Sequence, residues 1–212
     1  MDFLTKDEYL ALLNACELDS ALGRRDYLML SLFYNTGVRV AELLGLKGKD
    51  IIRDAKGLPS YIHVHGKGRK DRNVPLWKST AELLSTFIES HSTDDNAILF
   101  VNRTEGALTR SGVRYRLNRL VKMAVASTPS MNRKVISSHT FRHTVALNLL
   151  QSGVDISTIA IWLGHESILT THKYMEADME MKRRTLEKVE ELGNNPFHFR
   201  PNDVVLAFLD SL

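Results

Sequence analysis

Residues 51–76, IIRDAKGLPSYIHVHGKGRKDRNVPL, decide the fold because they interrupt a largely helical sequence with a different hydrophobic pattern. Residues 61–64 and 74–76 are short runs with apolar side chains, and a glycine-bearing turn at 66–68 joins them. Runs of this length on either side of such a turn predict antiparallel strands. A first strand near residues 51–52 completes a predicted three-stranded antiparallel sheet.

On both sides of this sheet the apolar residues recur with helical spacing. Thr5 and Glu8 have the spacing of a capping box, which opens a helix. Residues 27–34 are almost wholly apolar, which predicts a helix at the centre of the core. We therefore expect an α+β fold that is mainly α-helical, with a surface loop at 127–130. The predicted helices cover residues 5–18, 24–35, 39–44, 78–90, 110–126, 139–152, 155–163, 167–175 and 178–192.

Composition places the chain among ordinary globular proteins, with 212 residues of which 43% are hydrophobic and 25% charged. The net charge is only +3, but basic residues cluster at 66–72 and 103–122, where they can neutralise phosphates. A solvated protein surface explains such clusters equally well. Cys16 is the single cysteine, so no disulfide forms within the chain. Without a signal peptide or membrane span, we expect a cytoplasmic protein.

A set of polar side chains has the chemistry needed to cleave a phosphodiester without a metal or another cofactor. Arginines bind phosphate oxygens through paired hydrogen bonds, and a tyrosine phenol is a nucleophile that can attack phosphorus. Lysine and histidine supply the proton transfers, each contributing roughly 10²- to 10⁴-fold in rate. The candidate catalytic residues are Arg39, Lys67, His139, Arg142, His165 and Tyr174.

The local context of these residues makes the set specific. Arg39 follows a glycine break at Gly37, where a new helix begins and backbone N–H groups point outward. His139 and Arg142 are three positions apart, so they are neighbours on one helical face. Tyr174 follows the Leu163–Gly164–His165 motif at a distance of nine residues from its histidine.

This ordered set closely resembles the catalytic domain of the tyrosine recombinases, the phage-integrase family with its Xer-type and Cre-type enzymes. The resemblance covers residues 3–190 and implies the DNA breaking-rejoining enzyme fold. It also implies site-specific DNA cleavage and rejoining through a 3′-phosphotyrosine, with integration, excision or inversion as the outcome. By this resemblance Arg39, Arg142 and His165 bind the scissile phosphate, and Tyr174 is the nucleophile. Lys67 protonates the leaving 5′ oxygen, and His139 exchanges a proton with the tyrosine. Glu42 supports the site.

Other residues of the same types have simpler interpretations. Arg69, Lys70, Arg72, Arg110 and Arg114 are candidate DNA contacts, although for the helix carrying Arg110, Arg114 and Arg116 a solvated face is equally compatible. His139 and His143 have a spacing that could hold a metal, but no carboxylate motif accompanies them, so we expect none. The other tyrosines are expected to be half-buried core residues: Tyr9, Tyr27, Tyr34, Tyr61 and Tyr115.

The resemblance also sets expectations for domains and partners. We expect the catalytic domain to occupy residues 1–192, without the additional N-terminal domain of most family members, and a tail at 193–212 to dock on a neighbouring subunit. The expected partners are double-stranded DNA with specific sites, a homo-oligomer (a tetramer in the synapse) and an accessory or partner recombinase. Competing functions are a type IB topoisomerase, an inactive DNA-binding regulator and a metal-dependent nuclease.

Overall fold

The computed structural model describes residues 2–66, 71–90, 94–165 and 179. The chain divides into two compact units, residues 1–177 and 178–212, so the predicted boundary at 192/193 falls in the second unit, of which only Met179 is described. The predicted helix at 167–175, the predicted helix at 178–192 apart from Met179, and the tail at 193–212 lie outside the described residues. No helix among the described residues is long and apolar enough to cross a membrane.

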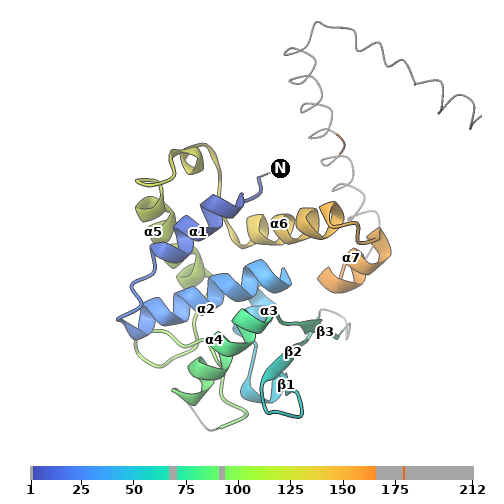
Figure 1. Cartoon of the computed structure of the whole chain (residues 1–212). Helices are drawn as coiled ribbons and strands as arrows, with labels where there is room; N and C mark the ends of the chain where they lie inside the picture. The colour runs from blue at the N-terminus through green and yellow to red at the C-terminus, as the bar shows by residue number, and fades with distance from the viewer. Residues whose placement is uncertain (1, 67–70, 91–93, 166–178, 180–212) are drawn as a thin grey trace, which may run out of the picture. The chain divides into compact units, whose positions relative to one another are not determined.

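The elements of the first unit appear in the order shown in Figure 1. Among the described residues, three α-helices precede the sheet and four follow it. This is the predicted α+β arrangement. The helices are α1 (Lys6–Asn14), α2 (Ala21–Thr36), α3 (Val40–Leu44), α4 (Lys78–Glu89), α5 (Arg110–Ala124), α6 (Ser138–Gln151) and α7 (Ile156–Leu163), the 3₁₀ helices are η1 (Gly48–Asp50) and η2 (Pro129–Arg133), and the strands are β1 (Ile51–Arg53), β2 (Pro59–Val64) and β3 (Arg72–Pro75).

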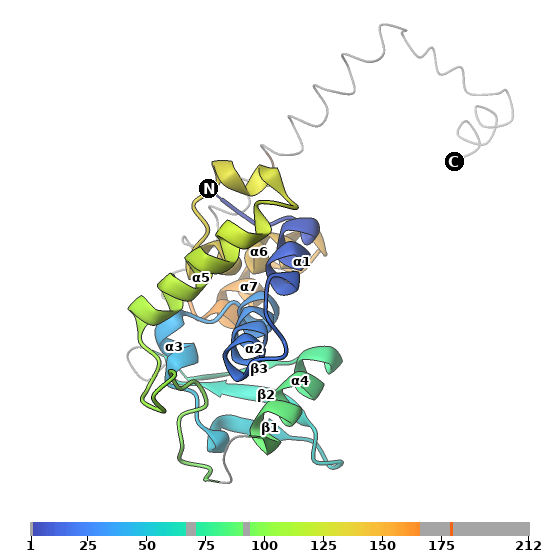
Figure 2. The same ribbon diagram turned by 90° about the vertical axis from the view of Figure 1, so that its left-hand side faces the viewer.

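The predicted three-stranded antiparallel sheet is confirmed, with strand order β1-β2-β3. Ile62 pairs with Val74 and Val64 pairs with Arg72. Because side chains alternate across a strand, these four residues share one face. Ile62, Val64 and Val74 on that face are buried, and α4 packs against β2 (Figure 2). The opposite face of the β2–β3 hairpin carries Tyr61 and Asn73, which are exposed, and His63, which is partly exposed.

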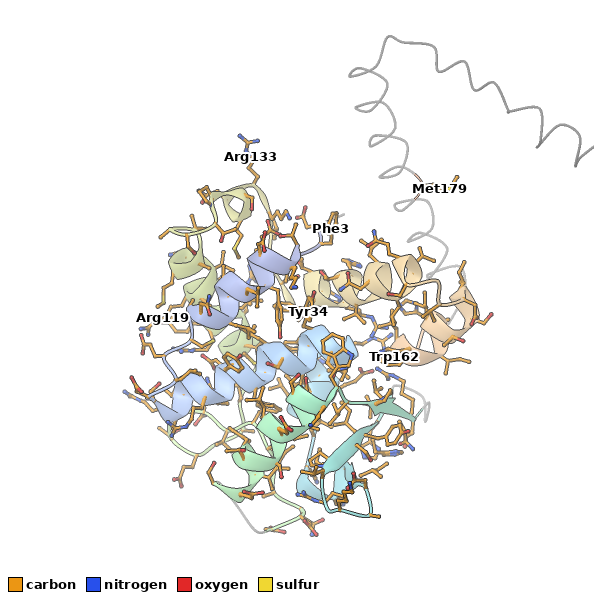
Figure 3. The ribbon with its side chains drawn as sticks, in the orientation of Figure 1. Phe3, Tyr34, Arg119, Arg133, Trp162 and Met179 are labelled. Carbon is orange, nitrogen blue, oxygen red and sulfur yellow. The ribbon has the colours of Figure 1, made fainter. Side chains whose placement is uncertain are left out.

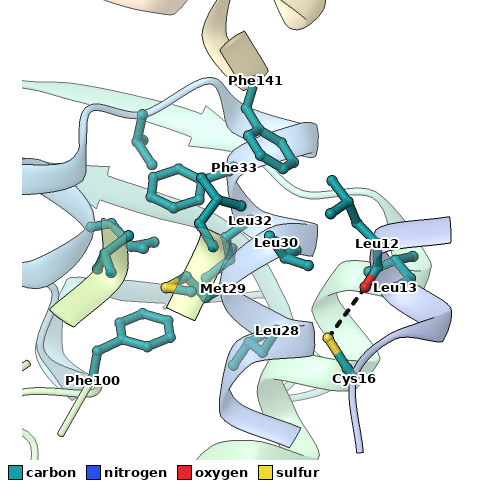
Figure 4. Packing of buried hydrophobic residues seen from close by; sticks show 14 of the residues in the cluster. Leu12, Leu13, Cys16, Leu28, Met29, Leu30, Leu32, Phe33, Phe100 and Phe141 are labelled. Carbon is teal, nitrogen blue, oxygen red and sulfur yellow. Dashed lines mark hydrogen bonds between the residues drawn. The ribbon is translucent and has the colours of Figure 1, made fainter. Parts of the chain in front are cut away.

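Helix α2 is the central helix that its apolar sequence predicts. It packs against α1, α4 and α6, and Met29 and Phe33 are fully buried within it. Figure 4 shows these two side chains facing Phe100 and Phe141, which come from the 98–101 stretch and from α6. Burying large apolar side chains from distant segments is the main source of stability for this unit.

The capping box at the start of α1 is confirmed. The Thr5 hydroxyl accepts a hydrogen bond from the Glu8 N–H at 3.2 Å, and the Thr5 N–H donates to the Glu8 carboxylate at 2.8 Å. The helix ends at Asn14 rather than at Leu18. Leu18 is exposed, so burial does not hold it in the helix. Ser20 already caps the next helix, because its hydroxyl accepts a hydrogen bond from the Gly23 N–H at 2.9 Å.

The expected surface loop at 127–130 is exposed at Ser127, Pro129 and Ser130, but residues 129–133 form η2, where Met131 is buried. Tyr61 and Tyr115 are not half-buried core residues, since 44% and 66% of their surfaces are exposed. Tyr61 lies on the open face of the sheet and Tyr115 on the outer side of α5. The spacing of apolar residues alone did not reveal which side of each element packs against the core.

Candidate active site

The site is organised by the C-terminal end of α7. Gly164 adopts the left-handed conformation with a φ of 63°, and two hydrogen bonds close the helix. The His165 N–H donates to the Ala160 carbonyl at 2.9 Å, and the Gly164 N–H donates to the Ile161 carbonyl at 3.1 Å. This pair of bonds is a Schellman motif, which ends a helix and leaves its last carbonyls without partners inside the helix.

Three arginines from three different elements bind those last carbonyls in succession. Arg72 on β3 donates from Nε to the Trp162 carbonyl at 2.8 Å. Arg142 on α6 donates to the Leu163 carbonyl, and Arg39 donates from Nη2 to the Gly164 carbonyl at 3.0 Å. The carbonyls at a helix C-terminus carry partial negative charge, so they hold guanidinium groups that would otherwise repel one another.

A second glycine turn places Arg39 and Arg142 on the same spot. Helix α2 ends at Gly37, whose φ is 63°, and the Gly37 carbonyl accepts a hydrogen bond from Arg142 Nη1 at 2.9 Å. A Cβ on Gly37 would lie 2.6 Å from the Leu163 side chain. The turn therefore packs directly on the end of α7, and the close approach of these two segments requires glycine.

Glu42 binds two of the three arginines. Its carboxylate accepts hydrogen bonds from the Arg39 N–H at 2.8 Å and from Arg39 Nη1 at 2.9 Å. It also accepts from Arg72 Nη2 at 2.9 Å and Nη1 at 3.2 Å. Burial opposes ionisation of Glu42, but the hydrogen bonds from Arg72 and Arg39 outweigh it and lower its pKa. Glu42 is thus an anion at neutral pH that fixes both guanidinium groups.

His165 is the next residue after Gly164, and the positive charges of the same three arginines act on its imidazole. Its pKa is lowered from 6.5 to about 4, first by burial and then by Arg142, Arg39 and Arg72. The imidazole is therefore neutral at neutral pH and can donate or accept a hydrogen bond without carrying charge. The lowered pKa of His165 indicates, in addition to the hydrogen bonds, that the three guanidinium groups lie close together around this residue.

The two ends of this arrangement differ in accessibility. The Arg142 residue is only 5% exposed, whereas the Arg39 side chain is 37% exposed. Arg142 therefore forms the floor of the site and Arg39 its accessible rim. His139 is exposed on the first turn of α6, on the same helix as Arg142. An anion approaching Arg39 would meet three guanidinium groups and one internal carboxylate, so the site favours negatively charged ligands.

The metal interpretation of His139 and His143 gains no support among the described residues. These two histidines do not belong to any group of three potential metal ligands there. Burial, His139 and Arg142 together lower the pKa of His143, which is the effect of a positively charged surrounding rather than of a carboxylate-rich one.

Four predicted residues fall outside the described part of the chain: Lys67, Arg69, Lys70 and Tyr174. The strands that flank the hairpin turn end at Val64 and begin at Arg72. Arg110 and Arg114 are exposed on α5, while Arg116 of the same helix forms an ion pair with Asp26. Other exposed basic side chains, Arg119 and Arg133, point away from the body of the unit (Figure 3).

Arg72 corrects the sequence analysis, which expected a surface contact to DNA. Its side chain is only 8% exposed and is bound to Glu42, so it supports the site from within. The alternation of side chains along β3 could have shown this, because residues 72 and 74 share one face of the strand and Val74 is a core residue. The carbonyls of Trp162, Leu163 and Gly164 are the other parts that sequence reasoning missed, and backbone acceptors leave no mark in a sequence.

Comparison with known proteins gives a consistent result. The phage integrase family matches residues 2–181. A putative integrase/recombinase, y4rC, of Sinorhizobium fredii is 41% identical over 212 residues, covering all of this chain and 63% of that protein. The tyrosine recombinase XerC of Chlamydia trachomatis serovar L2 is 34% identical over 186 residues, covering 85% of this chain and 56% of XerC. The chain thus spans about 60% of the length of these relatives.

Solved structures agree with the sequence relatives. The crystal structure of XerA recombinase aligns with a TM-score of 0.69 at 31% identity, covering 87% of this chain and 65% of that one. XerH site-specific recombinase, bound to a palindromic difH substrate in a post-cleavage complex, aligns with a TM-score of 0.72 at 27% identity. That match covers 89% of this chain and 53% of XerH. The predicted fold class is confirmed.

Proposed function

Because the chain belongs to the phage integrase family, we propose that it is the catalytic part of a site-specific recombinase that cleaves and rejoins DNA through a 3′-phosphotyrosine. This is the function that the resemblance implies and that the names of the relatives support. The single observation that carries it for this chain is the binding of Arg72, Arg142 and Arg39 to three successive carbonyls at the end of α7.

That arrangement suits a phosphodiester in its transition state, when negative charge grows on the non-bridging oxygens. Arg39 and Arg142 would bind those oxygens, and neutral His165 would donate a further hydrogen bond. The guanidinium groups are held before the substrate arrives, so little reorganisation is needed during the reaction. Glu42 and Arg72 fix the orientation of Arg39 and would not touch the DNA.

The proposed reaction exchanges one ester for another. The Tyr174 oxygen attacks phosphorus and forms a tyrosine–phosphorus bond, and the bond from phosphorus to the 5′ oxygen breaks. The phenol proton passes to His139, and Lys67 donates a proton to the leaving 5′ oxygen. Reversal of the same steps with a different 5′ hydroxyl rejoins the strands, so the overall exchange consumes no cofactor.

The proposal includes the partners that recombination requires. The substrate is double-stranded DNA bearing specific sites, and the active assembly contains several copies of the protein, with four in the synapse. Arg110, Arg114, Arg69 and Lys70 are proposed contacts to the sugar–phosphate backbone. The tail at 193–212 is proposed to dock on a neighbouring copy, and an accessory or partner recombinase is a further candidate component. The single buried thiol, Cys16, agrees with the cytoplasm as the place of action.

Covalent capture from a pool of sequences tests the reaction, because no target site has to be chosen beforehand. Nicked duplexes with randomised arms are incubated with the protein in buffer containing a chelator, and protein-bound strands are recovered after denaturation. We expect parent protein to capture a defined set of sequences and Tyr174→Phe to capture none. Tyr61→Phe is the matched control, because Tyr61 is exposed on the sheet face opposite the core, and it should capture the same set.

Four results would overturn the proposal. Strand cleavage that requires a divalent metal ion and leaves no protein-bound strand indicates a metal-dependent nuclease, and capture that survives Tyr174→Phe excludes the assigned nucleophile. Relaxation of supercoiled plasmids of unrelated sequence, with no preferred duplex in the captured pool, indicates a topoisomerase. DNA binding without any adduct indicates a regulator that has lost the chemistry.

A further inference from the structure

The open face of the β2–β3 hairpin gathers a group of side chains that the recombination chemistry does not use. His63 and His65 are two positions apart on β2 and its extension, so they point to the same side. Asp71 precedes β3 and lies across from them. One ligand atom from each of these three residues lies within 4.8 Å of the other two.

The distances from the two histidine nitrogens to the Asp71 carboxylate are close to those of a tetrahedral metal centre. His63 Nε2 is 3.4 Å from Asp71 Oδ2, and His65 Nδ1 is 3.2 Å from the same oxygen. In a tetrahedral zinc site with bonds of about 2.0–2.1 Å, two ligand atoms are separated by about 3.3 Å. The ring centroids of His63 and His65 are 4.8 Å apart, and the rings are nearly perpendicular, at 77°.

The second nitrogen of each histidine has its own oxygen partner. His63 Nδ1 lies 2.7 Å from the Asn73 side-chain oxygen, and His65 Nε2 lies 3.0 Å from Asp50 Oδ1. Asp50 is buried, and its other oxygen accepts from the Lys47 N–H at 2.9 Å. When these nitrogens donate, the lone pairs of His63 Nε2 and His65 Nδ1 face the gap beside Asp71. Oxygen partners of this kind fix the tautomer and orientation of metal-binding histidines.

We propose that His63, His65 and Asp71 form a binding site for one divalent transition-metal ion of the zinc type. Two imidazole nitrogens and one carboxylate oxygen are ligands that Zn²⁺ accepts and that Mg²⁺ and Ca²⁺, which prefer oxygen alone, do not. The fourth position faces solvent and would hold water. The ion would join the end of β2 to the start of β3, closing the base of the hairpin turn.

Calorimetry of zinc binding to the metal-free chain of residues 1–212 tests the site directly. We expect one equivalent of Zn²⁺ to bind, and one equivalent of Co²⁺ to give the visible absorption of a tetrahedral centre. Asp71→Asn and His63→Ala each remove a ligand and should weaken binding at least about tenfold. Asn73→Ala leaves all three ligands in place but frees His63 Nδ1, and should weaken binding about 10- to 100-fold.

Glu82→Gln is the matched control, because Glu82 is an exposed carboxylate on α4, and its affinity should equal that of the parent. Circular dichroism verifies that each variant is folded. The proposal is overturned if no equivalent binds, or if binding persists unchanged in Asp71→Asn and His63→Ala, which would assign it to other histidines such as His139 and His143. The alternative in that case is a metal-free cluster in which charged His65 bridges Asp50 and Asp71. None of these measurements involves DNA cleavage, so their results do not depend on whether the proposed function is correct.

Discussion

Asp26 and Glu42 each bind two arginines, yet the two groups leave very different surfaces open. Asp26 is fully buried between Arg25 and Arg116, whose side chains are 5% and 16% exposed. Glu42 lies between Arg72 and Arg39, and the Arg39 side chain is 37% exposed. The same ion-pair chemistry thus joins α2 to α5 in one place and presents an accessible guanidinium in the other.

The surroundings explain the difference. Arg25 donates its remaining Nη1 to the Val101 carbonyl at 2.8 Å, so the Asp26 group ties together segments distant in sequence and faces no ligand. Near Glu42 a third arginine, Arg142, and the neutral His165 join the group at the end of α7. Both groups have more arginines than carboxylates, so an arginine–carboxylate cluster indicates a functional site only where solvent reaches a guanidinium group, as it does at Arg39.

The largest expected effect is on stability at Asp26. Asp26→Ala leaves two largely buried guanidinium groups without their carboxylate, which should lower the free energy of unfolding by about 3–5 kcal/mol. Urea denaturation followed by circular dichroism measures it. Replacing Arg25, Asp26 and Arg116 together by apolar residues of similar volume should restore most of the loss; a loss that remains in the triple variant would mean that the ion pairs themselves hold the fold.

Arg39 should show the opposite behaviour. Arg39→Ala removes an accessible phosphate ligand while Glu42 retains Arg72, so adduct formation on a captured duplex should slow about 10²- to 10³-fold with little change in the urea midpoint. Arg39→Lys should remain slow, because an ammonium group cannot form the paired hydrogen bonds. Single-turnover rates within about threefold of the parent would remove Arg39 from the site.

Gly164→Ala tests whether the end of α7 positions Arg72. Its φ of 63° costs alanine about 1–2 kcal/mol, and the new Cβ would lie 2.7 Å from Arg72 Nη1. Gly153→Ala is the control, because its φ is 82° and its Cβ would meet nothing within 4 Å. Both variants should lose similar stability, and only Gly164→Ala should also slow adduct formation. Equal rates in the two variants would show that Arg72 need not stay in place.

The smallest effect is the pH dependence that His165 contributes, because its imidazole is only partly buried. The unfolded chain takes up this proton near pH 6.5 and the folded protein only near pH 4. Between these values the unfolded state binds more protons, so the contribution to stability is complete above pH 6.5 and is lost as the pH falls to 4. His165→Gln should flatten the stability profile in that window; an unchanged profile would contradict the lowered pKa.

The sequence was sufficient for features that local chemistry determines. The β2–β3 hairpin followed from its apolar runs and glycine turn, and the capping box of α1 from the spacing of Thr5 and Glu8. The meeting of Arg39 and Arg142 followed from the family resemblance, and the structure brings both to the end of α7.

The sequence did not predict features that depend on contacts between residues distant along the chain. The pairing of Arg116 with Asp26 joins residues 90 positions apart, and nothing in the α5 sequence distinguishes Arg116 from the exposed Arg110 and Arg114. Arg72 was assigned to the surface because basic neighbours surround it, although the strand period places it beside Val74. The η2 helix was missed because Pro129 and Ser130 are typical loop residues and only the buried Met131 shows that the segment packs.

Adduct formation by Glu42→Gln and Asp26→Asn, each normalised to its folded fraction, tests the central claim most directly. Both changes replace a carboxylate that holds two arginines by an amide of the same shape. If Glu42 orients Arg39 for the phosphate, Glu42→Gln should slow the reaction by about 10²-fold while Asp26→Asn reacts at the parent rate. Equal normalised rates for the two variants would contradict the account.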